Sequence, residues 1–114
     1  SLVLGVGMAS YNHMTTGGGG EDATVSVLPD GSAVVVTGTT SQGHGHTVTW
    51  AQIASDVLGI PIEAIRVLEG DTDAIATGVG AVGSRSLQTA GMAIHQAANE
   101  VVDEARQLAA EMLE

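Results

Sequence analysis

The spacing of the apolar residues changes at about residue 41, and this change limits the folds open to the chain. Before it, residues 23–28 (ATVSVL) and 33–40 (AVVVTGTT) are alternating or β-branched, and residues 29–32 (PDGS) between them are typical of a turn. After it, apolar residues recur at the i, i+3, i+4, i+7 and i+8 positions of one helical face, at Trp50, Ile53, Ala54, Val57 and Leu58. The sequence therefore predicts a β-hairpin followed by a helix that Gly59 ends.

Weaker patterns predict the remaining elements. Residues 2–9 (LVLGVGMA) resemble a short strand, residues 61–64 a single helical turn, and residues 65–68 a third strand. Residues 69–83 have no period and form a long loop.

An apolar stripe from near Ser84 to the end predicts one helix of about 25 to 28 residues. Gly91 lies inside this helix, where we expect it to let another backbone approach. The expected fold is α+β, a single domain over residues 1–114. A small sheet, made of the hairpin and a third strand, packs on two helices, and the C-terminal helix is long.

Composition and charge exclude several classes of protein. The 114 residues contain no cysteine, so the chain cannot form disulfides, thiolate zinc sites or cysteine-ligated iron–sulfur clusters. Three Arg and no Lys against 13 Asp and Glu give a net charge of −10, which would repel nucleic acid. We find neither a membrane-spanning run nor the basic flank of a signal peptide, so we expect no membrane contact and a cytoplasmic location.

Two glycine-rich turns, residues 38–47 (GTTSQGHGHT) and 78–86 (GVGAVGSRS), each run directly into a predicted helix. The start of a helix presents unpaired N–H groups and the positive end of a dipole, and glycines let a phosphate approach the backbone. Both turns therefore suit an anion, with Ser84, Ser86 and Arg85 adding attraction. Such turns also occur without ligands, and neither matches a Walker A loop or a GxGxxG motif.

Other polar residues favour structural roles. His44 and His46 have no third ligand at a fixed spacing, so we expect imidazoles hydrogen-bonded to the backbone and no metal site. Asp71 and Asp73 follow Gly70, as in an Asx-type turn, and His95 is expected on a helix surface. No set of nucleophile, base and orienting residue is recognisable, so we assign no catalytic residue.

Residues 38–86 resemble the molybdenum-cofactor-binding subunit of the xanthine dehydrogenase and aldehyde oxidase family, most closely its aerobic carbon monoxide dehydrogenase-type large chains. The family pattern is a Gly-Gln-Gly-His turn, an Ala-Gln-Ile helix, a Leu-Gly-Ile-Pro stop, a Gly-Asp-Thr-Asp turn and a Gly-Ser-Arg-Ser helix start. Their order and spacing fit this chain. Three positions depart from it: His44 stands where Gln is common, Ala76 where Pro is frequent and Val82 where an aromatic residue is frequent.

The resemblance implies a segment of the C-terminal half of such a large chain, with the loops wrapping the pyranopterin and phosphate end of molybdopterin or its cytosine dinucleotide. One wall would be Gly43, His44, Gly45 and His46, and the other Gly83, Ser84, Arg85 and Ser86. The family's catalytic glutamate lies in a later motif, so this chain would contact cofactor without turning over alone.

The implied partners are the remainder of a molybdenum hydroxylase chain or companion subunits. One alternative is a non-catalytic homo-oligomeric scaffold or partner-binding module that keeps the fold without the cofactor. Another is a small phosphate or nucleotide binder that uses the same loops.

Overall fold

A three-stranded sheet forms the centre of the computed structural model, which describes residues 2–15 and 19–113. The strand order is β1 (Ala23–Val27), β2 (Ala33–Thr37) and β3 (Ile65–Glu69). β1 and β2 are antiparallel and form the predicted hairpin, whereas β3 pairs with β2 in parallel. In the hairpin turn, Asp30 Oδ1 accepts hydrogen bonds from the Ser32 hydroxyl and backbone N–H, and these lower the pKa of Asp30.

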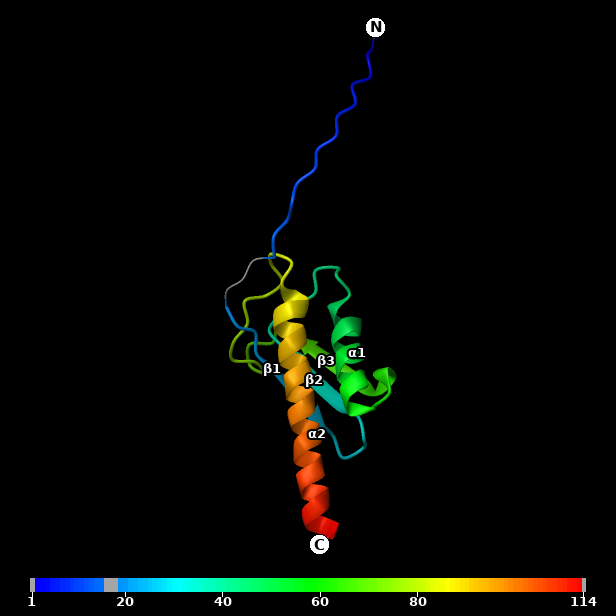
Figure 1. Cartoon of the computed structure of the whole chain (residues 1–114), viewed down its shortest axis with the longest axis vertical. Helices are drawn as coiled ribbons and strands as arrows, with labels where there is room; N and C mark the ends of the chain where they lie inside the picture. Colours follow the sequence, from blue (N-terminus) through cyan, green and yellow to red (C-terminus); the bar gives the residue numbers. More distant parts are fainter. Residues whose placement is uncertain (1, 16–18, 114) are drawn as a thin grey trace.

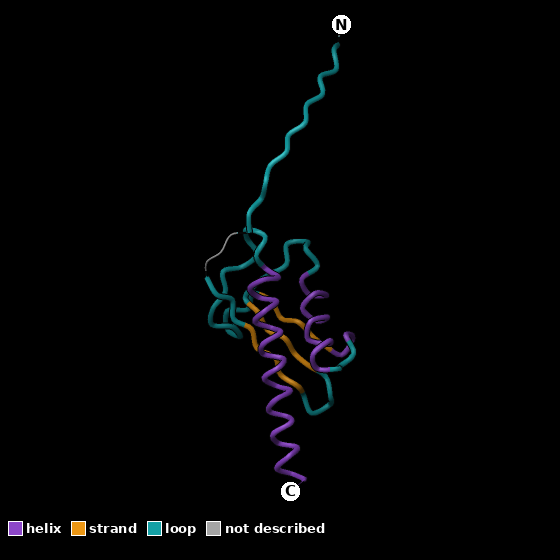
Figure 2. Tube along the Cα trace, in the orientation of Figure 1, coloured by secondary structure: helices purple, strands orange, loops and turns teal. Residues whose placement is uncertain are grey.

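Two helices cover one face of this sheet (Figures 1 and 2). α1 (His46–Leu58) joins β2 to β3 and lies against β3, whereas α2 (Met92–Leu113) lies against β1 and beside α1. α1 ends where Gly59 adopts a left-handed conformation and its N–H bonds to the Ser55 carbonyl, as predicted. A 3₁₀ turn (Ile62–Ala64, η1) precedes β3. The fold is therefore α+β, as the sequence predicted.

The long C-terminal helix starts with an irregular turn. Residues Leu87–Gly91 form a π turn, η2, which continues directly into the 22 residues of α2. Gly91 lies in this turn, and the sequence predicted that another backbone approaches it; the three atoms nearest to a Cβ at this position belong instead to side chains. That Cβ would lie 3.1 Å from Leu87 Cδ1 and 3.4 Å from both Ile53 Cδ1 and Trp50 Cζ3. Gly91 therefore packs directly against side chains of η2 and α1, including the indole.

The core lies between the sheet and the helices and is built around Trp50. This side chain is fully buried, together with Val35 of β2 and Ile94 and Ala98 of α2. The remaining core residues are Ala, Val and Ile, since the chain has no Phe and its second aromatic residue, Tyr11, is exposed. The indole of Trp50 is therefore the largest side chain of a core that is otherwise aliphatic.

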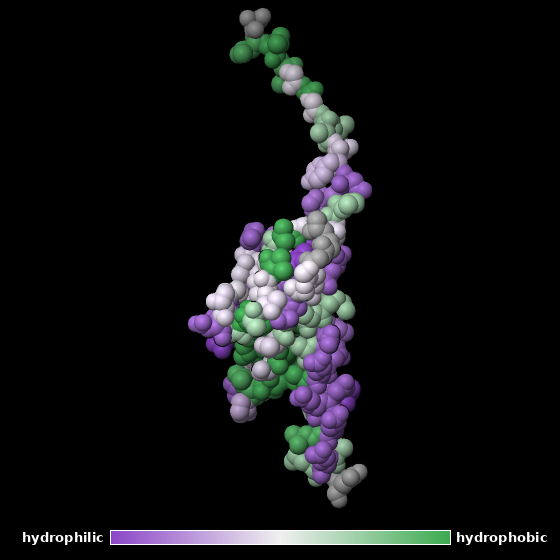
Figure 3. Space-filling view, turned by 90° about the vertical axis from the view of Figure 1, so that its left-hand side faces the viewer, coloured by the Kyte–Doolittle hydropathy of each residue, from purple (hydrophilic) through white to green (hydrophobic). Residues whose placement is uncertain are grey.

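Residues 2–9 do not form the strand that the sequence predicted. They run away from the body as an extended tail, which Figures 1 and 3 show as the long projection, and their apolar side chains are exposed. A strand is stabilised by pairing and by burial of one face, and this segment has neither in the structure. Within the described residues, no helix has the length and apolar composition needed to cross a membrane.

We expect Trp50→Ala to lower the free energy of unfolding by about 3–5 kcal/mol, because it leaves a large cavity at the centre of the core. Urea denaturation followed by circular dichroism measures this loss. Val48→Ala, at an exposed site on the same helix, is the control and should change stability by less than about 0.5 kcal/mol. Equal losses in the two variants would contradict the central position of the indole.

Candidate functional site

The two glycine-rich turns, which are far apart in the sequence, meet at one cavity of about 370 Å³. His44 and His46 line it at the start of α1. Residues 81–84 and Ser86, which precede η2, and Leu87, the first residue of η2, line it from the other side. His13 of the N-terminal segment also lines it.

A close backbone contact joins the two turns. A Cβ on Gly38 would lie 2.6 Å from the Gly78 Cα, so only glycine fits at this crossing. The sequence did not indicate whether the two turns are neighbours, and the structure shows that they are.

The α1 side of the cavity is a stack of aromatic rings. The His44 and His46 rings stack with centroids 4.6 Å apart, and His46 stacks in turn on Trp50 at 4.9 Å. His44 Nδ1 accepts a hydrogen bond from the Gln42 N–H at 3.2 Å, which leaves its Nε2 as the donor in the neutral ring. This side of the cavity thus rests directly on the buried core.

His46 has an unsatisfied polar atom at this wall. The residue is 7% exposed, and its Nδ1 has no hydrogen-bond partner among the described residues. The residue that precedes α1, Gly45, has a φ of 75° and provides no side-chain cap for the first turn of N–H groups. A bound group with oxygen or nitrogen atoms would form hydrogen bonds with His46 Nδ1 and with the first-turn N–H groups of α1. This wall therefore fits a polar ligand that carries an anionic group.

The opposite wall contains a strained residue. Ser84 has a φ of 56° and is the one non-glycine residue with positive φ in the part of the chain that the structure describes. It follows Gly83, whose φ is 62°. Such backbone conformations cost energy and persist where surrounding contacts enforce them, often at ligand sites.

Glu21 supplies the contacts that hold this wall. Its Oε1 accepts hydrogen bonds from the Val79 N–H at 2.9 Å, the Gly80 N–H at 3.0 Å and Arg85 Nη2 at 2.6 Å. The two side chains are 0% and 2% exposed, and Arg85 Nη1 also donates to the Gly19 carbonyl at 3.3 Å. A buried, charge-assisted network therefore ties the 78–86 segment to the residues just before β1.

The structure places the predicted site residues in two groups. His44, His46, Gly83, Ser84 and Ser86 line the cavity. Gly43, Gly45 and Arg85 do not line it: the two glycines shape the turn into α1, with φ values of 93° and 75°, and Arg85 points into the network around Glu21.

The sequence patterns assign no role to Glu21 or His13. A single glutamate after a glycine run carries no signal of a contact with residues 79–85, and only the folded chain brings them together.

The predicted structural roles of Asp71 and His95 are confirmed. The Asp73 N–H donates to Asp71 Oδ1 at 2.9 Å, which forms the predicted Asx-type turn. His95 is exposed on α2, as expected. Across residues 2–15 and 19–113, no three His, Cys, Asp or Glu side chains are arranged to hold a metal ion.

Comparison with known proteins decides the family. A family model described as the molybdopterin cofactor-binding domain matches residues 1–114. The chain belongs to this family. It is 44% identical over 112 residues to the carbon monoxide dehydrogenase large chain of Hydrogenophaga pseudoflava, covering 98% of this chain and 13% of that protein. It is 43% identical over 94 residues to the nicotine 6-hydroxylase large subunit of Paenarthrobacter nicotinovorans, covering 82% and 12%.

Solved structures agree with this assignment. The crystal structure of the Cu,Mo-CO dehydrogenase in its carbon monoxide reduced state superposes with a TM-score of 0.79 at 44% identity, covering 82% of this chain and 12% of that one. The molybdopterin cofactor-binding domain described here thus matches a segment of the large chains of molybdenum hydroxylases, and it spans about one-eighth of their length.

We expect Glu21→Gln to lower the free energy of unfolding by about 3–5 kcal/mol, because it removes the carboxylate charge opposite a buried guanidinium. The matched control is Asp103→Asn, which breaks an exposed ion pair with Arg106 and should cost no more than about 1 kcal/mol. Urea denaturation compares the two variants. Similar small losses in both would show that the buried pair does not hold the 78–86 segment.

Proposed function

We propose that the cavity between the two glycine-rich turns binds the pyranopterin and phosphate end of the molybdenum cofactor, as molybdopterin or its cytosine dinucleotide. The observation that supports this most is the meeting of the two turns at one cavity, since each turn by itself has the features of an anion site. Membership of the molybdopterin cofactor-binding family agrees with this ligand.

The residues of the cavity fit the two ends of such a ligand. The first-turn N–H groups of α1 and the hydroxyls of Ser84 and Ser86 are donors suited to phosphate oxygens. His46 Nδ1 is a buried polar atom that lacks a partner among the described residues, and the exposed His44 ring offers a flat face and an Nε2 donor to a planar heterocycle.

Local donors are needed because the chain as a whole carries a net charge of −10 and repels anions. The guanidinium of Arg85 is held by Glu21, so we do not assign it a direct contact with the cofactor.

The bound cofactor would supply the molybdenum centre of an oxidoreductase. This chain would hold and orient the cofactor, and we assign it no catalytic residue. Its relatives are large chains and subunits many times longer, and one of them is named as subunit gamma of a dehydrogenase complex. We therefore propose that the rest of a large chain, or companion subunits, complete the enzyme and bind its substrate.

Co-purification tests this proposal. The chain is purified from a host that makes the molybdenum cofactor, and molybdenum is measured by elemental analysis and pterin by fluorescence after oxidative release. We expect pterin to accompany the wild-type chain and to fall at least about tenfold in Gly83→Val, which strains the backbone and puts bulk on the cavity wall.

Gly31→Val is the matched control. Gly31 also has a positive φ, 86°, but it lies in the β1–β2 turn with open space around it. The control should therefore suffer a similar backbone strain and keep its pterin. Equal loss in both variants would refute the assignment of this cavity. A wild-type chain without pterin that forms a discrete oligomer would favour the non-catalytic scaffold.

A further inference from the structure

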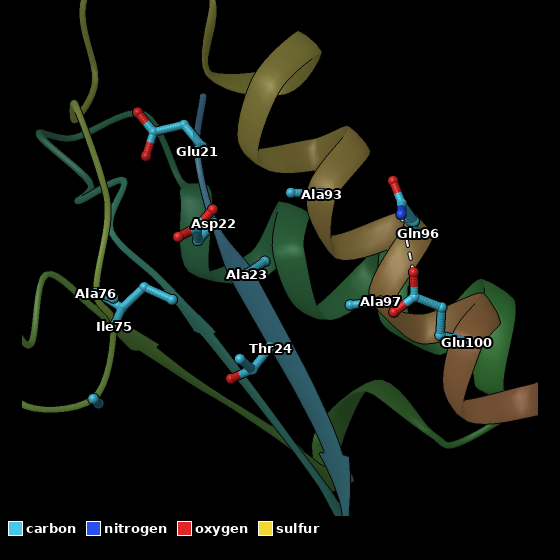
Figure 4. Close-up of a pocket in the computed structure, with 11 residues that line it drawn as sticks. Glu21, Asp22, Ala23, Thr24, Ile75, Ala76, Ala93, Gln96, Ala97 and Glu100 are labelled. Carbon is cyan, nitrogen blue, oxygen red and sulfur yellow. Dashed lines mark hydrogen bonds between the residues drawn. The ribbon is translucent and has the colours of Figure 1, made fainter. Parts of the chain in front are cut away.

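A groove outside the cofactor cavity runs beside the free edge of the sheet. β1 is an edge strand, so one side of its backbone has no partner strand among the described residues. The groove has a volume of about 510 Å³ and lies between α2, β1 and residues 74–76 (Figure 4). Open strand edges attract other strands, and proteins usually cover them.

The α2 side of this groove is lined by small residues. Ala93 and Ala97 are one helical turn apart, are partly buried, and face the groove above β1, as Figure 4 shows. Gln96 and Glu100 form the polar rim and are joined by a hydrogen bond of 2.9 Å. Ala23 and Ile75 add apolar surface on the opposite side. The groove therefore has room for large apolar side chains against α2.

Residues 2–9 have the pattern that fits this space. In an extended segment, alternate side chains point to opposite faces. The even positions are all apolar side chains of valine size or larger (Leu2, Leu4, Val6 and Met8), whereas the odd positions are glycine or alanine except for Val3 (Val3, Gly5, Gly7 and Ala9). The four large side chains are 90% exposed or more in the structure. Apolar surface of this extent on one face of a segment indicates a binding role.

We propose that residues 2–9 fold back into this groove and pair with β1 as a fourth, antiparallel strand. The even-numbered side chains then pack against Ala93 and Ala97 of α2, and the odd-numbered ones lie on the open face of the sheet beside Thr24 and Ser26. Residues 10–22 connect the segment to β1 and give the chain the length to reverse direction. Figure 1 places the start of β1 below the point where the tail leaves the body.

Charge and connectivity favour this segment over other occupants. The exposed Asp22 and Glu100 line the groove and repel acidic peptides, but residues 2–9 carry no charged side chain. A segment on the same chain has a high effective concentration at the groove, so it competes well against the same segment of a second copy. The paired segment would also remove the exposed edge of β1.

Hydrogen exchange on the whole chain tests the proposal. We expect the amides of residues 3–9 to exchange at least about tenfold more slowly than in an unstructured peptide of the same sequence. Leu4→Asp puts a charge on the face against α2 and should abolish this protection. Val3→Asp, one residue away on the opposite face, is the matched control and should keep it. Exchange at the unstructured rate in the wild-type chain, or equal loss in the two variants, would overturn the proposal.

Disulfide trapping identifies the occupant, because the natural chain has no cysteine. Met8→Cys combined with Ala93→Cys or Ala97→Cys should form a disulfide within one chain. Met8→Cys with Leu108→Cys, on the exposed end of α2, should not. Disulfides only between chains, rising with protein concentration, would show that a second copy fills the groove and would contradict folding back.

Discussion

The buried ion pair between Glu21 and Arg85 fixes the position of the segment on which one wall of the cavity depends. Three donors from residues 79, 80 and 85 converge on one carboxylate oxygen, so this single side chain holds both ends of a glycine-rich segment. Glycines give such a segment many conformations in the unfolded chain, and the network offsets that entropy with charge-assisted hydrogen bonds. Ser84, which has a positive φ, lies inside the segment that these hydrogen bonds hold in place.

The opposite wall depends on the core. His44 stacks on His46 and His46 on Trp50, so the rings that face the cavity continue inward to the largest side chain of the interior. Gly91 packs against that indole, and the contact of Gly38 with Gly78 brings the two walls together. Stability and ligand binding therefore share residues, and changes to the core should also alter the cavity.

Local patterns were sufficient to predict most elements. The alternation in 23–37, the turn around Asp30 and the apolar stripes through Trp50 and Ile94 are short-range signals, and the helices and strands follow them. The resemblance of residues 38–86 to molybdenum hydroxylase large chains predicted the family, which the comparisons confirm. The prediction of a strand at residues 2–9 is wrong for this structure. An alternating pattern shows that a segment is suited to a sheet, but it does not show that a neighbouring strand is available for pairing.

Long-range contacts were beyond sequence reasoning. Arg85 lies in a motif that suits an anion, yet its guanidinium is held by a glutamate that comes before β1, and no spacing rule links the two. The meeting of the two turns likewise depends on how the loop after β3 crosses the end of β2. Both features arise only when the sheet and helices have assembled.

The proposed anion-binding cavity needs both glycine-rich turns. A titration of the ¹⁵N-labelled chain with inorganic pyrophosphate, followed by amide chemical shifts, tests it most directly. We expect shifts in residues 44–48 and in residues 83–87 that saturate together with one dissociation constant. Shifts confined to one turn, two different dissociation constants, or no change in either turn would contradict it.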